Sequence, residues 1–162
     1  QSAKFCGTPP LAHLAGLEVS LGLLKAEGLE AVHARHQRLG GAVQAAVRCC
    51  ATAGAVKLHC KDPLGFSTSV TAVEVSPGID PEALRVVARE KFQVAMAGGL
   101  GPLAGRVFRI GHLGDCNDLT LIAALSACEM GLKLSGVKLS ASGVQAAMDY
   151  FSANPIPALI RP

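Results

Sequence analysis

Apolar residues recur every three or four positions over the first third of the chain, a spacing that is typical of amphipathic helices. The pattern runs through residues 10–48 and is interrupted at Gly28, so we expect two consecutive helices there. Two shorter segments, residues 56–60 and 69–75, alternate apolar and polar side chains as half-buried strands do. Helices therefore precede the first strands of a sheet.

Capping residues and periodicity predict three further helices. Asp80 can accept a hydrogen bond from the first turn of a helix, and Pro81 suits the first helical position. Asp115, Asn117 or Asp118 can cap a later helix in the same way. These helices are expected at residues 81–90, 119–134 and 142–152.

Two more apolar segments, residues 92–96 and 106–110, are expected to be strands. Arg109 interrupts the second of them with a charge. Pairs of strands separated by helices, with no internal repeat, favour an α+β fold. We expect a small, mainly antiparallel sheet whose one face is covered by helices.

Composition agrees with a globular protein and excludes several classes. The 162 residues are 50% hydrophobic and 17% charged, and no apolar run approaches the ~20 residues that cross a bilayer. We therefore expect no membrane contact. The net charge is +3, the basic residues are scattered, and aromatic residues are 4% of the chain, so nucleic acid is not an expected partner either.

The thiols and imidazoles show no spacing that is typical of a metal or redox site. No C-x-x-C pair and no H-E-x-x-H pattern occurs, so we expect buried free thiols, surface histidines and no metal. A redox role for adjacent cysteines is weak, because adjacent cysteines rarely bridge. The residues concerned are Cys6, Cys49, Cys50, Cys60, Cys116, Cys128, His13, His33, His36, His59 and His112.

Three features carry candidate binding chemistry. Residues 98–105 are rich in glycine, but they lead into a strand and not a helix, so they are not a dinucleotide-binding loop; a close backbone approach and a plain turn both stay open. Arg109 is either a solvated edge-strand residue or the partner of a carboxylate. Thr8, before the first helix, suits either a helix cap or a phosphate contact.

Long motifs in a fixed order resemble one known family. Gly-Gly-Leu-Gly-Pro at residues 98–102 and Gly-Arg-Val-Phe-Arg-Ile-Gly-His-Leu-Gly at 105–114 are similar to the C-terminal part of the class V pyridoxal-phosphate aminotransferases. The likeness includes Gly-Thr-Pro-Pro at 7–10, and Glu-Gly-Leu-Glu at 27–30 with Arg-His at 35–36. Within the family, the glyoxylate aminotransferases that use serine are nearest, followed by those that use alanine.

The resemblance implies a domain organisation. Members of the family have a large cofactor domain, then a small C-terminal α+β domain, and they form homodimers with active sites between subunits. Residues 1–27 would join the two domains, 28–154 would form the small domain and 155–162 a tail. The family's Schiff-base lysine would lie upstream, so no catalytic residue is expected in this chain.

The resemblance also assigns two site residues. Arg109 would bind the α-carboxylate of the substrate, and Thr8 would contact the phosphate of pyridoxal phosphate in the neighbouring subunit. Phe5 replaces the tyrosine of the family's Tyr-x-x-Thr-Pro motif, so its phenol is missing.

The expected function is that of an aminotransferase portion, which moves an amino group from serine or alanine to glyoxylate or another 2-oxo acid. We expect a cytoplasmic location; the resemblance also admits the peroxisome, but no C-terminal peroxisomal signal is seen. The alternative is a non-catalytic α+β module for ligand binding or oligomerisation, in which Arg109 is an ordinary surface residue.

Overall fold

The computed structural model describes residues 6–51 and 54–155, and it confirms the α+β fold. The helices are α1 (Leu11–Glu27), α2 (Leu29–Ala51), α3 (Pro81–Phe92), α4 (Asp118–Leu134) and α5 (Gly143–Ala153). The strands are β1 (Val56–Leu58), β2 (Val70–Val75), β3 (Ala97–Gly98) and β4 (Val107–Gly111). Short 3-10 turns lie at Pro63–Gly65 and Gly101–Leu103. None of the described helices is both long and apolar enough to cross a membrane.

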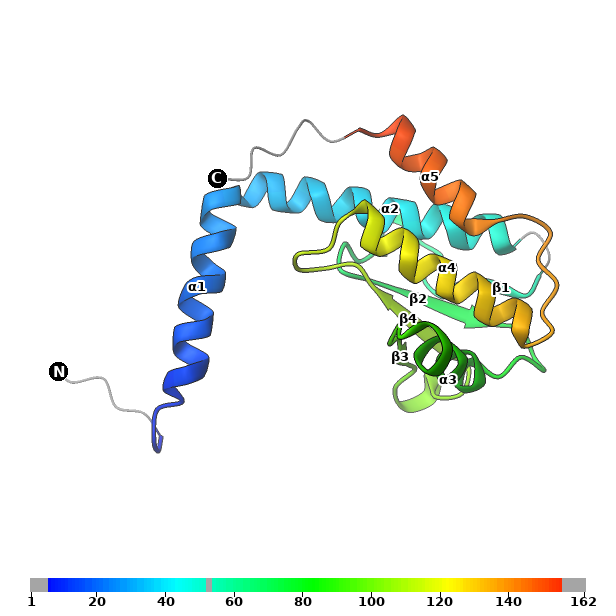
Figure 1. The fold of residues 1–162 in the computed structure, drawn as a ribbon, viewed down its shortest axis with the longest axis horizontal. Coiled ribbons are helices and arrows are strands. Elements are labelled where there is room, and N and C mark those ends of the chain that lie inside the picture. Colours follow the sequence, from blue (N-terminus) through cyan, green and yellow to red (C-terminus); the bar gives the residue numbers. More distant parts are fainter. Residues whose placement is uncertain (1–5, 52–53, 156–162) are drawn as a thin grey trace.

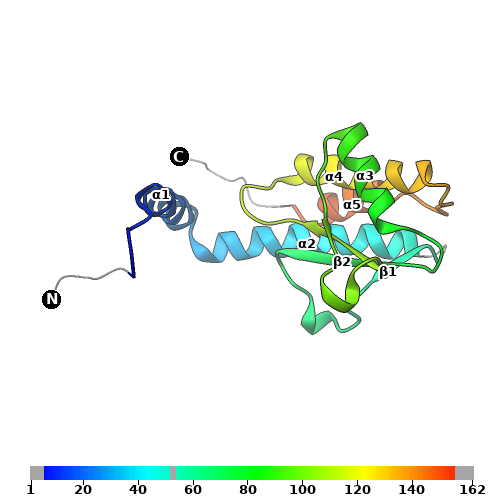
Figure 2. The ribbon, with the colours of Figure 1, turned by 90° about the horizontal axis from the view of Figure 1, so that it is seen from below.

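The four strands form an antiparallel sheet in the order β1-β2-β4-β3. Figure 2 shows α2, α3, α4 and α5 on one side of this sheet, with the short turns on the other. Thr71, Val73 and Val75 of β2 are buried toward the helices, as are Phe108 and Ile110 of β4. The core therefore lies between one sheet face and the helices, and the opposite face is covered in part by the short turns.

Capping residues in the sequence predicted where two of the helices begin. The Asp80 side chain accepts from the backbone N–H of Glu82, with Pro81 at the first position of α3. Of the three candidate caps for α4, Asn117 is the one used, in a reciprocal capping box with Thr120. These two caps confirm the expected starts of α3 and α4.

The strand expected at residues 92–96 is wrong. Helix α3 continues through Phe92 and ends at Gln93, whose φ of 56° reverses the chain while its N–H binds the carbonyls of Ala88 and Arg89. Val94 and Met96 still pack on the core, but as irregular chain, and β3 is limited to Ala97–Gly98. The apolar run thus marked burial and not strand pairing.

Arg38 on α2 fastens three helices together. Its guanidinium forms an ion pair with Asp118 at the start of α4, with 2.8 Å between Nη2 and Oδ2. The same group donates to the backbone carbonyls of Phe151 and Asn154 at the end of α5 and lies 4.4 Å from the Phe151 ring centroid. A single side chain therefore serves the beginning of one helix and the end of another.

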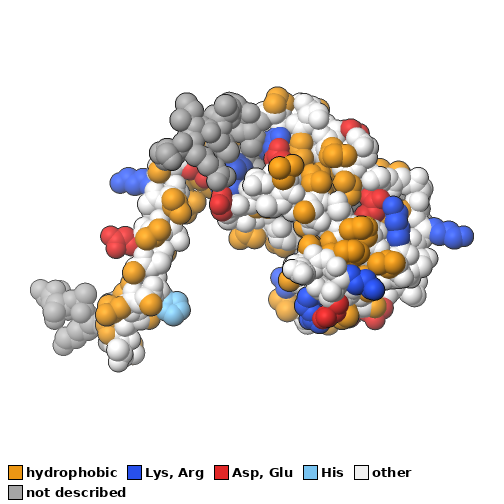
Figure 3. All heavy atoms as spheres, viewed as in Figure 1, with side chains coloured by type: hydrophobic (Ala, Val, Ile, Leu, Met, Phe, Trp, Pro, Cys, Tyr) orange, Lys and Arg blue, Asp and Glu red, His pale blue; other side chains and the backbone are white. Residues whose placement is uncertain are grey.

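Helix α1 projects away from this body (Figure 1). The chain turns at Gly28, whose φ of 86° is a conformation that glycine adopts at little cost. None of the residues of α1 is buried, although the helix is rich in leucine and valine, and orange apolar side chains run along it in Figure 3. A helix that is apolar on all sides is normally covered by other protein.

Candidate functional site

Arg109 lies at the centre of the open sheet face. Its strand β4 is an inner strand between β2 and β3, so the interpretation as an edge-strand arginine is wrong. Arg109 is paired with Ala72 of β2 and Ala97 of β3, and it alternates with Phe108 and Ile110, which face the core. The side chain therefore leaves the sheet opposite the helices, between two neighbours that are only a methyl group long.

The guanidinium of Arg109 is held at one end. Its Nε donates to the carbonyl oxygen of Gly98 at 2.8 Å, and the side chain is half-buried. Among the described residues the two terminal nitrogens have no hydrogen-bond partner. Two parallel donors on a fixed plane match the two oxygens of a carboxylate. The arrangement can therefore bind a carboxylate in a bidentate manner.

The glycine-rich segment connects β3 to β4 and supplies that Gly98 carbonyl. A Cβ at Gly99 would lie 2.0 Å from the carbonyl oxygen of Leu103, which no side chain can tolerate. The loop therefore needs glycine because two backbone segments touch, which settles the choice in favour of a close backbone approach over a plain turn. Its fold fixes the carbonyl that orients Arg109.

The loop after β4 begins with a buried histidine, so the expectation of surface histidines is wrong at His112. Its side chain is fully buried, Nδ1–H donates to the Thr68 carbonyl at 3.1 Å, and Nε2 accepts from the Thr71 hydroxyl at 2.9 Å. These bonds define a neutral ring with the proton on Nδ1. Burial lowers the pKa of His112, and nearby His36 adds to this, while the Thr68 hydrogen bond opposes it.

Acid is therefore expected to destabilise the protein through His112. The unfolded chain takes up the proton near the ordinary pKa of about 6.5, whereas the folded chain does so at a lower pH. The free energy of unfolding should be highest above that value and fall by up to ~1.4 kcal/mol per pH unit as the pH drops below it. Urea titrations between pH 5 and 8 measure this slope.

His112→Asn should flatten that pH dependence, because the amide does not titrate. His33→Asn is the control, since His33 is an exposed histidine on the same protein. Equal slopes in the His112→Asn variant and the parent would contradict the assignment.

Three side chains of α2 hold the rest of this loop. Arg35 Nη1 donates to the carbonyls of Gly114 and Cys116 at 2.8 and 3.2 Å. His36 Nε2 accepts from the Gly114 N–H at 3.1 Å, and its Nδ1 donates to the Val32 carbonyl at 2.7 Å. Arg38 binds Asp118 just beyond the loop. The segment that follows the Arg109 strand is therefore tied to α2 throughout.

Thr8 is exposed and precedes α1, and α1 projects away from the sheet that carries Arg109 (Figure 1). The helix-cap interpretation is wrong, because the N-cap position is Pro10 and no side chain caps the helix. Thr8 and Arg109 are therefore not brought together within one chain. Phe5 lies outside the described residues.

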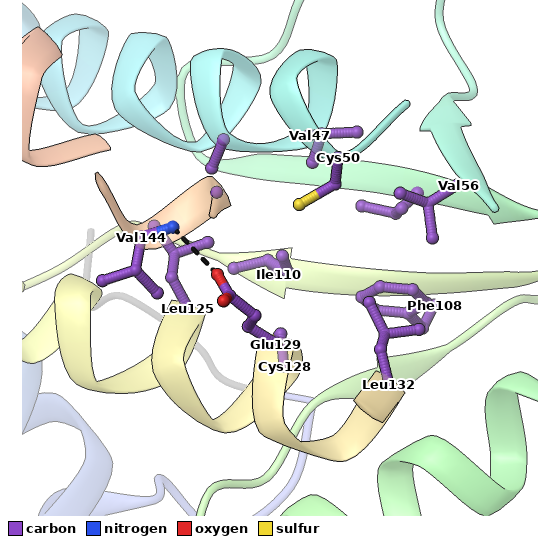
Figure 4. A pocket seen from close by; sticks show the side chains of 13 residues that line it. Val47, Cys50, Val56, Phe108, Ile110, Leu125, Cys128, Glu129, Leu132 and Val144 are labelled. Atoms are coloured by element: carbon purple, nitrogen blue, oxygen red, sulfur yellow. Dashed lines mark hydrogen bonds between the residues drawn. The ribbon is translucent and has the colours of Figure 1, made fainter. Parts of the chain in front are cut away.

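A partly open pocket of about 30 Å³ lies on the core side of the sheet and is separate from the Arg109 face. Apolar side chains of α2, α4 and the sheet line it, together with the Glu129 carboxylate (Figure 4). Glu129 accepts hydrogen bonds from the Ser142 hydroxyl and the Val144 N–H at 2.9 and 3.3 Å, so it anchors the first turn of α5. The pocket has room for about one water molecule and is not a substrate site.

The cysteines are more varied than expected. Cys50 and Cys128 are buried, Cys6 is exposed, the other three are partly exposed, and no disulfide joins any of the six. Burial raises the pKa of Cys128 to about 12, and burial also raises the pKa of Cys50 above its ordinary value, so both thiols are protonated at neutral pH. The described residues contain no group of His, Cys, Asp or Glu that could hold a metal ion.

Comparisons with known proteins find similar sequences and folds among aminotransferases. The chain is 45% identical to the serine–glyoxylate aminotransferase of Hyphomicrobium methylovorum over 91% of its length, which is 36% of that enzyme. It is 39% identical to the L-aspartate–glyoxylate aminotransferase of Paracoccus denitrificans over 89% of its length, again 36% of the relative. The pyridoxamine–pyruvate aminotransferase of Mesorhizobium loti superposes with a TM-score of 0.85 at 33% identity, covering 94% of this chain and 38% of that one. No protein-family model matches.

Sequence and fold therefore show that the chain is homologous to a segment of the aminotransferases. Its relatives include a serine–glyoxylate and an L-aspartate–glyoxylate aminotransferase, which confirms the resemblance to aminotransferases carried by the motifs. The chain spans a little over a third of the length of these relatives.

Sequence reasoning missed the residues that hold the loop after the Arg109 strand. Arg35 and His36 belong to a motif that resembles the family, but the motif assigns no role to either residue. Their partner Gly114 is 79 residues from Arg35 along the chain, and periodicity carries no information about such a contact. The signal available in the sequence was an arginine among the apolar positions of α2. A charge that is buried at such a position needs a partner, and the structure shows that Arg35 is buried.

Proposed function

We propose that the complete protein is a pyridoxal-phosphate-dependent aminotransferase and that this chain is its small C-terminal domain. The observation that carries the proposal is Arg109, whose side chain leaves the sheet on the side opposite the helices and whose two terminal nitrogens have no partner within residues 6–51 and 54–155. An aminotransferase must hold the carboxylate that its amino acid and its 2-oxo acid share. A fixed guanidinium binds both substrates through the same two hydrogen bonds.

The residues of this chain fit the phosphate end of the cofactor at one point. Thr8 offers an exposed hydroxyl next to the uncapped first turn of α1, where backbone N–H groups favour an anion. When bound, pyridoxal phosphate supplies the electron sink of the reaction. The contribution of this chain is to bind and orient: Arg109 at the substrate carboxylate and Thr8 at the phosphate.

Residues 1–27 would join the small domain to a preceding large domain. The leucines of α1 support this role because they are exposed on every side of the helix and need a cover. Residues 28–154 would form the small domain and 155–162 a tail. Since Thr8 and Arg109 lie far apart in one chain, we propose a homodimer in which Thr8 serves the site of the partner subunit.

Glyoxylate is the proposed amino acceptor and serine the proposed donor. The printed names of two relatives share glyoxylate but differ in the donor, serine in one and L-aspartate in the other. A guanidinium binds the α-carboxylate and does not contact the side chain of the amino acid, so Arg109 is compatible with either donor. Donor choice therefore belongs to residues that contact the amino-acid side chain.

Half-reactions of the complete protein test the function. The purified protein should carry the absorbance band of pyridoxal phosphate, lose it on addition of serine and regain it on addition of glyoxylate. Alanine and aspartate serve as competing donors. A protein without the band and without amino transfer would favour the alternative, a non-catalytic ligand-binding or oligomerisation module.

Replacement of Thr8 with valine should weaken the affinity for pyridoxal phosphate by roughly 10-fold. The substitution keeps the shape of the side chain and removes one hydrogen bond to a charged group, worth about 1.5 kcal/mol. Equilibrium dialysis of the complete protein measures the change, with Thr68→Val, at another exposed threonine, as the control.

Mixed dimers decide which subunit Thr8 serves. Thr8→Val chains are paired with chains that lack the family's lysine, so the one lysine-bearing site receives an intact Thr8 from its partner. Normal affinity there supports the cross-subunit contact. A weak site would place Thr8 in its own subunit, and unchanged affinity in the Thr8→Val homodimer would remove it from the cofactor site.

A further inference from the structure

A partly buried ion pair closes the corner between α1 and α2. Glu27 is the last residue of α1, Gly28 breaks the helix, and Arg35 lies two turns into α2. Arg35 Nε and Nη2 donate to the two carboxylate oxygens of Glu27 at 2.7 and 2.9 Å. The side chains are 8% and 24% exposed, so solvent screens this pair little. The Glu27 carboxylate raises the pKa of Arg35 through these bonds.

The same guanidinium also contacts the loop between β4 and α4. Its remaining nitrogen binds the carbonyls of Gly114 and Cys116, while His36 accepts the N–H of Gly114. Both backbone polar groups of Gly114 are thus held by adjacent residues of α2. This loop follows directly after the strand that carries Arg109. One side chain therefore contacts the end of α1 and the segment next to the proposed carboxylate site.

The direction of α1 needs such a restraint. Gly28 has backbone angles of 86° and 132°, in a region where glycine is permissive, and α1 buries none of its residues against the rest of the chain. Without the pair, rotation at Gly28 would meet little resistance within this segment. A planar bidentate pair between positions eight residues apart fixes the corner in one geometry.

We propose that the Glu27–Arg35 pair is a positioning element that couples the direction of α1 to the β4–α4 loop and thereby sets the placement of Arg109. The proposal rests on the proposed function of Arg109 as the carboxylate ligand. Neither Glu27 nor Arg35 touches substrate; both act through the loop. In the complete protein, the part that precedes α1 would be held in register with the small domain through this corner.

Glu27→Gln and Arg35→Lys in the complete, cofactor-loaded protein test the coupling by two measurements. Amide hydrogen exchange should become at least ~10-fold faster in peptides that cover Gly28 and residues 112–117, while α5 exchanges as before. The KM for amino acid and 2-oxo acid should rise about 10-fold with kcat changed less than about 3-fold, because binding geometry is lost and chemistry is not.

The variants are chosen to separate positioning from charge and from general stability. Lysine keeps the charge of Arg35 but cannot make both the paired hydrogen bonds to Glu27 and the two hydrogen bonds to the carbonyls. Arg35→Lys should therefore not keep the hydrogen exchange and the KM of the parent. The double variant should be no worse than Arg35→Lys, since the two residues act as one unit. Glu90→Gln is the control, because it breaks the exposed Arg89–Glu90 pair and should change neither measurement.

Unchanged exchange at residues 112–117 in Glu27→Gln would overturn the proposal, and so would faster exchange with an unchanged KM. If Arg35→Lys does not fold, Glu27→Gln carries the test alone, since its amide remains at a partly exposed corner. A separate variant tests the proposed function itself. If Arg109 does not bind the carboxylate, Arg109→Ala would leave the KM unchanged, whatever the rate of amide hydrogen exchange at residues 112–117.

Discussion

Arg109→Ala in the complete protein is expected to lower kcat/KM for amino acids by at least ~100-fold. The substitution removes two charge-assisted hydrogen bonds to the substrate carboxylate, worth about 1.5–3 kcal/mol each. Arg109→Lys should restore little, because an ammonium group cannot both bind the Gly98 carbonyl and present two parallel donors. Steady-state kinetics with serine and glyoxylate measure both variants.

The thermal stability of Arg109→Ala should change far less than its activity, since the side chain makes one hydrogen bond to a backbone carbonyl and faces away from the core. Arg106→Ala is the matched control, an exposed arginine three residues earlier that pairs with Glu74. A protein that unfolds on loss of Arg109, or that keeps normal kcat/KM, would make this residue structural.

Gly99→Ala is expected to lower both stability and activity. Its Cβ would meet the Leu103 carbonyl oxygen and carbon at 2.0 and 2.5 Å, so one backbone segment must shift, at a cost of about 1–3 kcal/mol or more. The shift would carry with it the neighbouring Gly98 carbonyl, which orients Arg109. We expect kcat/KM to fall at least ~10-fold in the protein that remains folded. Urea unfolding and kinetics of the same sample measure the two effects.

Gly111→Ala provides the comparison, because a Cβ at that end of β4 would make only an ordinary 3.5 Å contact with the Leu113 side chain. Its stability should stay near that of the parent. Equal behaviour of the two alanine variants would show that the loop accommodates a side chain at Gly99 and does not fix Arg109.

Local chemistry in the sequence predicted the helices well. The caps at Asp80 and Asn117 depend on residues two or three positions away, and the leucine spacing defines a helix without reference to the rest of the fold. The strand at residues 92–96 failed because an apolar run indicates burial, whereas strand pairing depends on a partner. Gln93, in a left-handed conformation, turns the chain before any pairing begins.

The sequence predicted a site residue where a family motif contained it. The Phe-Arg-Ile-Gly segment pointed to Arg109, but its inner position follows from the order of strands, which no local pattern encodes. The burial of His112 was missed for a related reason. Its two partners, Thr68 and Thr71, belong to β2 and the segment before it, more than 40 residues away in sequence.

The packing of α5 on α2 has a consequence for how the chain is made. Tyr150 lies over Gly41 so closely that a Cβ there would stand 2.1 Å from the phenol oxygen, and a Cβ at Gly143 would stand 2.8 Å from the Cys50 sulfur and 3.0 Å from the Ala46 carbonyl oxygen. These contacts join segments about a hundred residues apart. During synthesis, one side of α2 must therefore stay exposed to water until α5 has left the ribosome. Completion of this core depends on the slow closure of a very long loop, and not on local helix formation.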